Sequence, residues 1–321
     1  MARRHELHTA DGKSIDDLLE TARRLIDRYN DAEKPFREMF AETVSEQTFY
    51  QEAEQDDIYW DELSEGEQPR AMRDEESEGK WMTIRGTTYS KSLGMTQKYI
   101  RRTSSEEIIR KLRRLLSGAK NTEEQLIYST LQNGIIDGSG AWYDIKDYGE
   151  YEFDNSHDHV FEDTDSLFDN DGVDDTAYEA HEHIEEAKRH LTHHGMEGPF
   201  VALVSNQFKR DLKDEISWDA QYHVPMATNM RSADTQDLDI VIDGVRLVES
   251  PWMAGEKFYV TQAENESPVK FLEERPVQVT RPNGALVRSP GDLLGANAEA
   301  DYGCRMADPL AAVEVSATNV K

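Results

Sequence analysis

Residues 56–92 limit the folds open to this chain more than any other stretch. The segment is polar and punctuated by glycine, and its aromatic side chains gather at its ends: Tyr59 and Trp60 at one, Trp81 and Tyr89 at the other. A segment of this length with so little to bury is uncommon inside a compact domain. We interpret it as a two-stranded excursion with a charged tip, which is either disordered or needs a partner surface.

The composition indicates a folded chain with a strongly acidic surface. The 321 residues carry 65 acidic and 36 basic side chains, a formal charge of −29, yet 37% of the residues are hydrophobic. Such a charge repels phosphate and anionic lipid, which argues against a dedicated nucleic-acid binder. At molar ionic strength the Debye length is only ~3 Å, so self-repulsion is screened. The composition therefore favours a protein that works in concentrated salt, in a halophilic host.

The cysteine count and the N-terminus favour a soluble protein in a reducing compartment. Cys304 is the only cysteine, so no intrachain disulfide can form. Its small and apolar neighbours suit a buried, inert thiol better than a nucleophile. The N-terminus lacks the apolar core of a signal peptide, and no window approaches 18 apolar residues, so we expect no membrane segment.

Helical periodicity appears first near the N-terminus. Ser14 is placed to cap a helix that buries Leu18 and Ile26 on one face. A second helical run begins at Pro35 and carries apolar side chains as far as Val44. Together they predict a short amphipathic region in front of the main domain.

The longest predicted helix follows the polar segment. Ser104 and Glu107 have the spacing of a capping box, and apolar residues recur at helical spacing as far as Gly134, with a break expected near Gly118. Between Lys98 and Lys120 there are eight basic residues against two acidic ones. For the basic run alone, an ordinary solvated face is the default interpretation.

The C-terminal half mixes strands with helices. A buried strand is predicted at Phe200–Val204, followed by a helix from Asn206. Apolar alternation on both sides of Asp243-Gly244 predicts a hairpin, and further strands are predicted in GEKFYVTQ, PVQVTRPNG and LAAVEVSAT. The fold class is α+β, with long-range connections.

The stretch AHEHIEEAKRHLTHHG, residues 180–195, holds five of the ten histidines. An apolar stripe runs along it, and His183, Glu186, His190 and His194 fall on the flank at spacings of three or four. Glu186, His190 and His194 could supply three zinc ligands. The segment is not HExxH, so a half-exposed polar flank is the default interpretation.

No pattern in the chain marks a catalytic centre or a cofactor site. DNDGVDD, with Asp169 and Asp171, resembles the start of a calcium loop, but the twelfth position is Ala180 instead of an acidic residue. There is no GxSxG, phosphate-binding GxxxxGK[ST] or GxGxxG after a strand. We predict no enzyme activity, no cofactor and no resident metal.

In their order, these pieces resemble the coat-protein fold of tailed double-stranded DNA viruses, which encapsulin shells share. HGMEGPFVALVSNQFKRDL is similar to the helix, glycine-proline turn, strand and helix of its axial domain, and DGVRLVESPWMAGEKFYVTQ to the hairpin before a presented strand. The resemblance implies four parts: an N-terminal helical arm (1–57), an extended loop (58–92), a peripheral domain with a long spine helix and long strands (93–137 and 264–303) and an axial domain (138–263 and 304–321).

The resemblance implies a major capsid protein, here of a haloarchaeal virus. Such a subunit self-assembles in the host cytoplasm into pentamers and hexamers, which form an icosahedral virion shell around double-stranded DNA. Scaffold, portal and decoration proteins would be further partners, and no membrane would be involved. The extended loop would place Tyr59, Trp60, Trp81 and Tyr89 between subunits. A DNA-facing basic helix would present Lys98, Arg101, Arg102, Arg110, Lys111, Arg113 and Arg114.

Two alternatives stay open at this point. An encapsulin-type compartment has the same fold and a different cargo. A metal-dependent hydrolase built on the helix from His183 to His194 is the remote alternative, which zinc analysis of the purified protein would distinguish.

Overall fold

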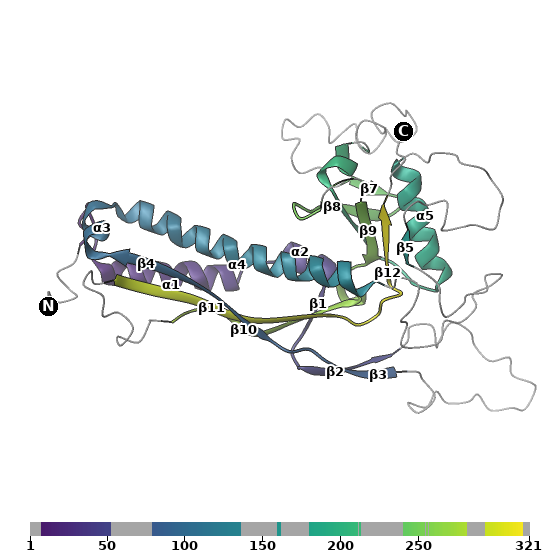
Figure 1. The fold of residues 1–321 in the computed structure, drawn as a ribbon, viewed down its shortest axis with the longest axis horizontal. Helices are drawn as coiled ribbons and strands as arrows, with labels where there is room; N and C mark the ends of the chain where they lie inside the picture. Colours follow the sequence, from purple (N-terminus) through teal and green to yellow (C-terminus); the bar gives the residue numbers. More distant parts are fainter. Residues whose placement is uncertain are drawn as a thin grey trace, which may run out of the picture.

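A long body and a second, separate sheet make up the molecule in the computed structural model (Figure 1). The structure describes residues 8–52, 79–135, 159–161, 180–210, 212, 240–253, 255, 257–280 and 293–316. The body consists of a long helix lying along a four-stranded sheet, and the second sheet lies beyond one end of that helix.

Helix α4 (Ser105–Gly134) is the spine of the body. Its N-cap residue Ser104 accepts a hydrogen bond from the backbone N–H of Glu107, which is one half of the predicted capping box. The Glu107 side chain accepts from the hydroxyl of Tyr99. The helix is continuous through Gly118, so the predicted break is wrong. A glycine in a helix costs only about 1 kcal/mol relative to alanine. Burial of the apolar stripe of α4 on both sides of Gly118 outweighs that cost. The buried residues of this stripe include Leu112, Leu116, Ile127 and Leu131.

The sheet beneath α4 combines two strands from the N-terminal third of the chain with two consecutive strands near its C-terminus. Its strand order is β1-β10-β11-β4, with β1 parallel to β10 and the other neighbours antiparallel. The two long central strands meet with Val269 opposite Met306. The strands are β1 (Glu42–Val44), β4 (Thr87–Thr96), β10 (Val269–Thr280) and β11 (Leu293–Met306).

The N-terminal helices pack on this body. Helix α1 (Ile15–Asn30) begins with a capping box between Ser14 and Asp17. Helix α2 (Pro35–Phe40) ends earlier than the sequence predicts, because Val44 belongs to strand β1 and pairs with Leu272. The short helix α3 (Gln97–Arg102) precedes α4.

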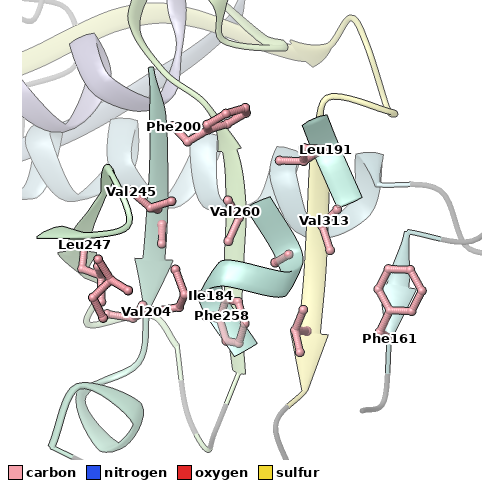
Figure 2. Packing of buried hydrophobic residues seen from close by; sticks show 14 of the residues in the cluster. Phe161, Ile184, Leu191, Phe200, Val204, Val245, Leu247, Phe258, Val260 and Val313 are labelled. Atoms are coloured by element: carbon pink, nitrogen blue, oxygen red, sulfur yellow. The ribbon is translucent and has the colours of Figure 1, made fainter. Parts of the chain in front are cut away.

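The second sheet has six strands in the order β5-β12-β9-β6-β8-β7. Helix α5 (Ala180–His193) covers one face, where its Ile184 and Leu191 pack against Val260 and Val313 (Figure 2). The strands are β5 (Val160–Phe161), β6 (Phe200–Val204), β7 (Ile240–Ile242), β8 (Val245–Glu249), β9 (Lys257–Gln262) and β12 (Ala312–Ser316), with the 3-10 turn η5 (Glu264–Glu266) after β9.

Three sequence predictions for this sheet are confirmed. All five residues of β6 are buried. The helical segment 206–210 follows it, with Phe208 inside. Asp243 and Gly244 connect β7 to β8 with φ of 44° and 80°, the left-handed pair that a two-residue hairpin turn requires.

A separate two-stranded ribbon completes the described structure. Strands β2 (Thr48–Glu52) and β3 (Gly79–Thr83) pair antiparallel, with Thr48 opposite Thr83. The ribbon extends to one side of the body (Figure 1).

Candidate functional site

An aromatic pair stands exposed on the β2–β3 ribbon. Tyr50 and Trp81 lie opposite each other in the register, with ring centroids 5.4 Å apart. The exposed fraction is 70% for Trp81 and 38% for Tyr50. The sequence predicts an interface role for Trp81 but not for Tyr50, because residue 50 falls in the predicted helical arm. Tyr59 and Trp60 lie outside the described residues.

Hydrogen bonds and one close backbone contact hold the base of the β2–β3 ribbon where the chain crosses the main sheet. The N–H of Ile84 donates to the carbonyl of Gln47 at 2.7 Å, and the Gln47 side chain donates to Glu274 of β10 at 3.0 Å. A Cβ at Gly303 of β11 would lie 2.5 Å from Ile84 and 2.9 Å from the carbonyl oxygen of Arg85. Only glycine permits this close crossing, which therefore sets the position from which the ribbon leaves the body.

Tyr89 occupies a different place from Trp81. It lies in β4, and its ring centroid is 6.1 Å from that of Tyr302 on the neighbouring strand β11. The side chain is half-buried, so in the single chain it packs on its own sheet.

The basic residues gather on α3 and the first half of α4. Within the described chain none of the seven predicted residues forms an ion pair. Lys111 is half-buried, with its ammonium 4.1 Å from the centre of the Tyr99 ring. The other six are exposed: Lys98, Arg101, Arg102, Arg110, Arg113 and Arg114. These seven side chains, which we call the basic face, concentrate positive charge in an otherwise acidic chain.

A buried carboxylate fastens the N-terminal helices to the body. Glu123 of α4 is only 3% exposed and accepts hydrogen bonds from the hydroxyls of Tyr29 and Tyr302 at 2.8 and 2.9 Å. The ammonium of Lys34 lies 3.3 Å from Glu123, and the guanidinium of Arg37 lies 2.9 Å from Glu273 of β10. The buried charge is thus paired and hydrogen-bonded, as a charge away from water must be.

The same network holds two tyrosines in their neutral form. Burial, with the Glu123 charge as the next cause, raises the pKa of Tyr29 and of Tyr302 far above the ordinary value. Both hydroxyls therefore remain available as donors to Glu123 throughout the physiological range. No sequence motif marks this site, since its members lie on α1, α2, α4, β10 and β11.

Three histidines meet in the second sheet. His190 and His194 of the α5 region converge with His159, which directly precedes β5, and all three are buried. Their ligand nitrogens lie within 4.8 Å of one another. His183 is also fully buried, so the expected half-exposed histidine flank is wrong. The flank faces the sheet and the β5 segment instead of solvent.

The other predicted metal candidates are not in this cluster. Glu186 lies one turn before His190, and its carboxylate pairs with Arg189 at 2.6 Å. Asp169 and Asp171 lie outside the described residues. Sequence reasoning missed His159, because it is distant from α5 in the sequence and comes near only when β5 pairs with β12.

Cys304 fits the predicted inert thiol. It lies half-buried in β11 instead of fully buried as predicted, and desolvation raises its pKa to about 12. Because the thiolate is the reactive form, a thiol with this pKa is a poor nucleophile near neutral pH.

Solved capsid structures share the architecture described above. The structure described as Mycobacterium phage Patience aligns with a TM-score of 0.55 at 12% identity, covering 98% of this chain and 91% of its own. The capsid of cyanophage P-SCSP1u gives 0.53 at 8% identity, covering 86% and 85%. The capsid of a native GTA particle gives 0.53 at 12%, covering 88% and 89%. These likenesses confirm the predicted α+β coat-protein fold.

The sequence itself carries the family signal. No match is found among curated proteins. A family model described as phage capsid protein matches residues 81–315, from the β3 side of the ribbon through the spine helix to the last strand of the second sheet. With most of its length in that match and its fold shared with capsid structures, the chain belongs to the phage capsid protein family and is a shell-forming structural protein of the virion.

Proposed function

We propose that this chain is the major capsid protein of a tailed double-stranded DNA virus of a haloarchaeal host. It forms pentamers and hexamers of an icosahedral shell and has four parts: a helical arm, an extended loop, a peripheral domain and an axial domain. The extended loop starts at strand β2 (Thr48–Glu52) instead of residue 58 and ends before strand β4 (Thr87–Thr96). The observation that carries the proposal is the β2–β3 ribbon, which presents an exposed aromatic pair away from the body that holds its base.

The ribbon is the part of the chain that would reach a neighbouring subunit. Moving a large aromatic side chain such as tryptophan from water into an interface is favourable in free energy. Aromatic side chains are accordingly enriched at protein interfaces. Trp81 and Tyr50 would supply such an anchor, and the predicted loop residues Tyr59 and Trp60 would extend it. Tyr89 would not, because it packs on Tyr302 in the body. Burial of about 2,000 Å² or more per contact is typical of permanent assemblies.

Substitution of the ribbon tests this role. Trp81→Ser should leave the unassembled subunit as stable as the wild type, because the side chain is 70% exposed, but should abolish or strongly reduce shells seen by electron microscopy at molar KCl. Val241→Ser, at an exposed apolar residue of edge strand β7, is the matched control and should still assemble. Normal shells from Trp81→Ser, and from a chain lacking residues 58–90, would refute the role.

The basic face would contact the packaged DNA. Its charges have no acidic partner in the described chain, and phosphate contacts of this kind are independent of sequence. Arg113→Gln with Arg114→Gln should lower the nucleic acid content of purified shells. Arg23→Gln with Arg24→Gln, at exposed positions of α1, is the control. Location of α3 and the start of α4 on the outer surface would contradict the proposal.

The cargo distinguishes the virus from an encapsulin-type compartment. Shells that contain double-stranded DNA support the viral subunit, whereas shells with a protein cargo and no nucleic acid support the compartment. Assembly in the host cytoplasm with scaffold, portal and decoration proteins belongs to the viral proposal. The proposed role needs no enzyme activity, and in the described chain no helix is long and apolar enough to cross a membrane.

A further inference from the structure

We propose that His159, His190 and His194 bind one divalent transition-metal ion, of which zinc fits best, and that this ion fastens strand β5 to helix α5. Imidazole is a preferred ligand of zinc, copper and nickel, and three histidines form a known zinc ligand set. The inference does not depend on which cargo the shell encloses.

The nitrogens already stand near the spacing that such an ion requires. The Nε2 atom of His194 lies 3.1 Å from Nε2 of His159 and 3.2 Å from Nε2 of His190. Two ligands about 2.05 Å from a tetrahedral zinc ion are separated by about 3.3 Å. The ligand nitrogens of the remaining pair, His159 and His190, lie within 4.8 Å of each other. A small rotation of the rings would therefore bring all three nitrogens around one ion.

Proton counting favours an ion over a hydrogen-bonded trio. Nδ1 of His159 lies 3.0 Å from the carbonyl oxygen of Ala312, which can only accept, so Nδ1 donates and Nε2 of the neutral ring carries a lone pair. With Nε2 of His159 unprotonated, no arrangement of neutral rings places a separate proton in each of the two contacts of the His194 Nε2 atom. With an ion between them, all three Nε2 lone pairs are used, and a metal-binding histidine commonly donates its other N–H to a carbonyl in this way.

The surroundings also suit a cation. His190 and His194 stand at the C-terminal end of α5, where Gly195, with φ of 78°, ends the helix and Met196 N–H bonds back to Leu191. The carbonyl groups of a helix C-terminus give a negative potential that stabilises a positive charge. The ring centroid of the buried Phe161 lies 5.3 Å from that of His190, in an edge-on arrangement.

The ion would cross-link strand β5 to helix α5. Strand β5 is paired with β12 at only two positions, Val160 and Phe161, and it is an edge strand of the six-stranded sheet. A ligand from His159, just before β5, with His190 in the last turn of α5 and His194 directly after it, would join this strand to the helix that covers the sheet. Three protein ligands leave one position of a tetrahedral ion for a water molecule.

Metal analysis of the full chain at molar KCl tests the site. After chelation and dialysis against Zn²⁺ with excess Mg²⁺, which occupies carboxylate sites, we expect one bound zinc per chain and a higher thermal midpoint than without zinc. Co²⁺ in place of Zn²⁺ should give the visible absorption of a tetrahedral nitrogen site. No zinc above background, or no shift of the midpoint, would overturn the proposal.

Two single substitutions locate the ion. His159→Gln should weaken zinc binding by at least about 100-fold, since loss of even a hydrogen-bonded partner of a ligand costs 10–100-fold. His193→Gln, on the same helix but outside the cluster, should bind zinc as the wild type does. Equal zinc content in both variants would mean adventitious surface binding and would refute the site. If His159→Gln does not fold, the cobalt spectrum and zinc-dependent midpoint of the wild type decide.

Discussion

Glu123 illustrates what a single side chain contributes to this subunit. Its carboxylate lies inside the body, receives two tyrosine hydroxyls and lies beside Lys34 and Arg37. Removal of one member of a buried ion pair leaves a charge without compensation and costs about 3–5 kcal/mol. Glu273 still pairs with both cations, so the lower part of that range applies.

We therefore expect Glu123→Gln to lower the free energy of unfolding of the unassembled subunit by about 3 kcal/mol. The matched control is Glu124→Gln, one residue further along α4, where the carboxylate pairs with the exposed Lys120 at 3.5 Å. Surface pairs contribute at most about 1 kcal/mol. Urea unfolding of both variants measures the difference, and equal losses would contradict the role of Glu123.

Two buried tyrosines, Tyr259 and Tyr302, and the half-buried Tyr29 determine the behaviour of the chain at high pH. Burial is the main cause that raises the pKa of Tyr29, Tyr259 and Tyr302 above the ordinary value of 10.0. Their contribution to stability is complete below about pH 10 and is lost as the pH rises further, because the unfolded chain ionises first. Above about pH 10, each of these tyrosines should lower the free energy of unfolding by about 1.4 kcal/mol per pH unit.

Absorbance at 295 nm, recorded with circular dichroism, measures this effect. We expect Tyr29, Tyr259 and Tyr302 to ionise only when the fold is lost, whereas all 13 tyrosines of the denaturant-unfolded chain should titrate near pH 10. Complete ionisation of the folded chain near pH 10 would show that these hydroxyls are not held as described.

Among the elements, α4 contains two glycines in opposite situations. A Cβ at Gly118 would meet no atom within 4 Å, whereas a Cβ at Gly134 would lie 2.5 Å from Cβ of Met306 on β11. Gly118→Ala should therefore raise the free energy of unfolding by about 0.5–1 kcal/mol. Gly134→Ala should lower it by about 1–3 kcal/mol, because Met306 must move. Thermal unfolding of the two variants, made by the same substitution in the same helix, checks both signs.

Local patterns in the sequence predict individual elements well. The stripes of α1 and α4, the buried strand β6 and the Asp243-Gly244 hairpin are confirmed, because periodicity and turn chemistry act over a few residues. Gly118 misled the prediction, since a residue that disfavours a helix weighs little against packing on both sides of it. Val44 also misled the prediction, because its apolar side chain suits a strand as well as a helix.

For the whole molecule, strand pairing was beyond the reach of the sequence. Periodicity marks a strand but does not identify its neighbour, so the parallel pairing of β1 with β10 and of β5 with β12 could not be foreseen. The Glu123 network and the three-histidine cluster depend on those pairings. The residues of the Glu123 network and His159 look ordinary in the sequence. His190 and His194 stand out there as possible ligands, but their third partner is identified only when distant segments meet.

The net charge of −29 should make the stability of the whole chain depend on salt. The Debye length shortens from about 30 Å at 0.01 M to ~3 Å at 1 M, so repulsion among the carboxylates is screened as KCl is added. We expect the thermal midpoint at pH 7 to rise steeply over this range. Near pH 4.7, the isoelectric point from the sequence, the net charge vanishes and the dependence on KCl should become much weaker. A midpoint at pH 7 that is the same in dilute buffer and in molar KCl would remove the basis for a halophilic host.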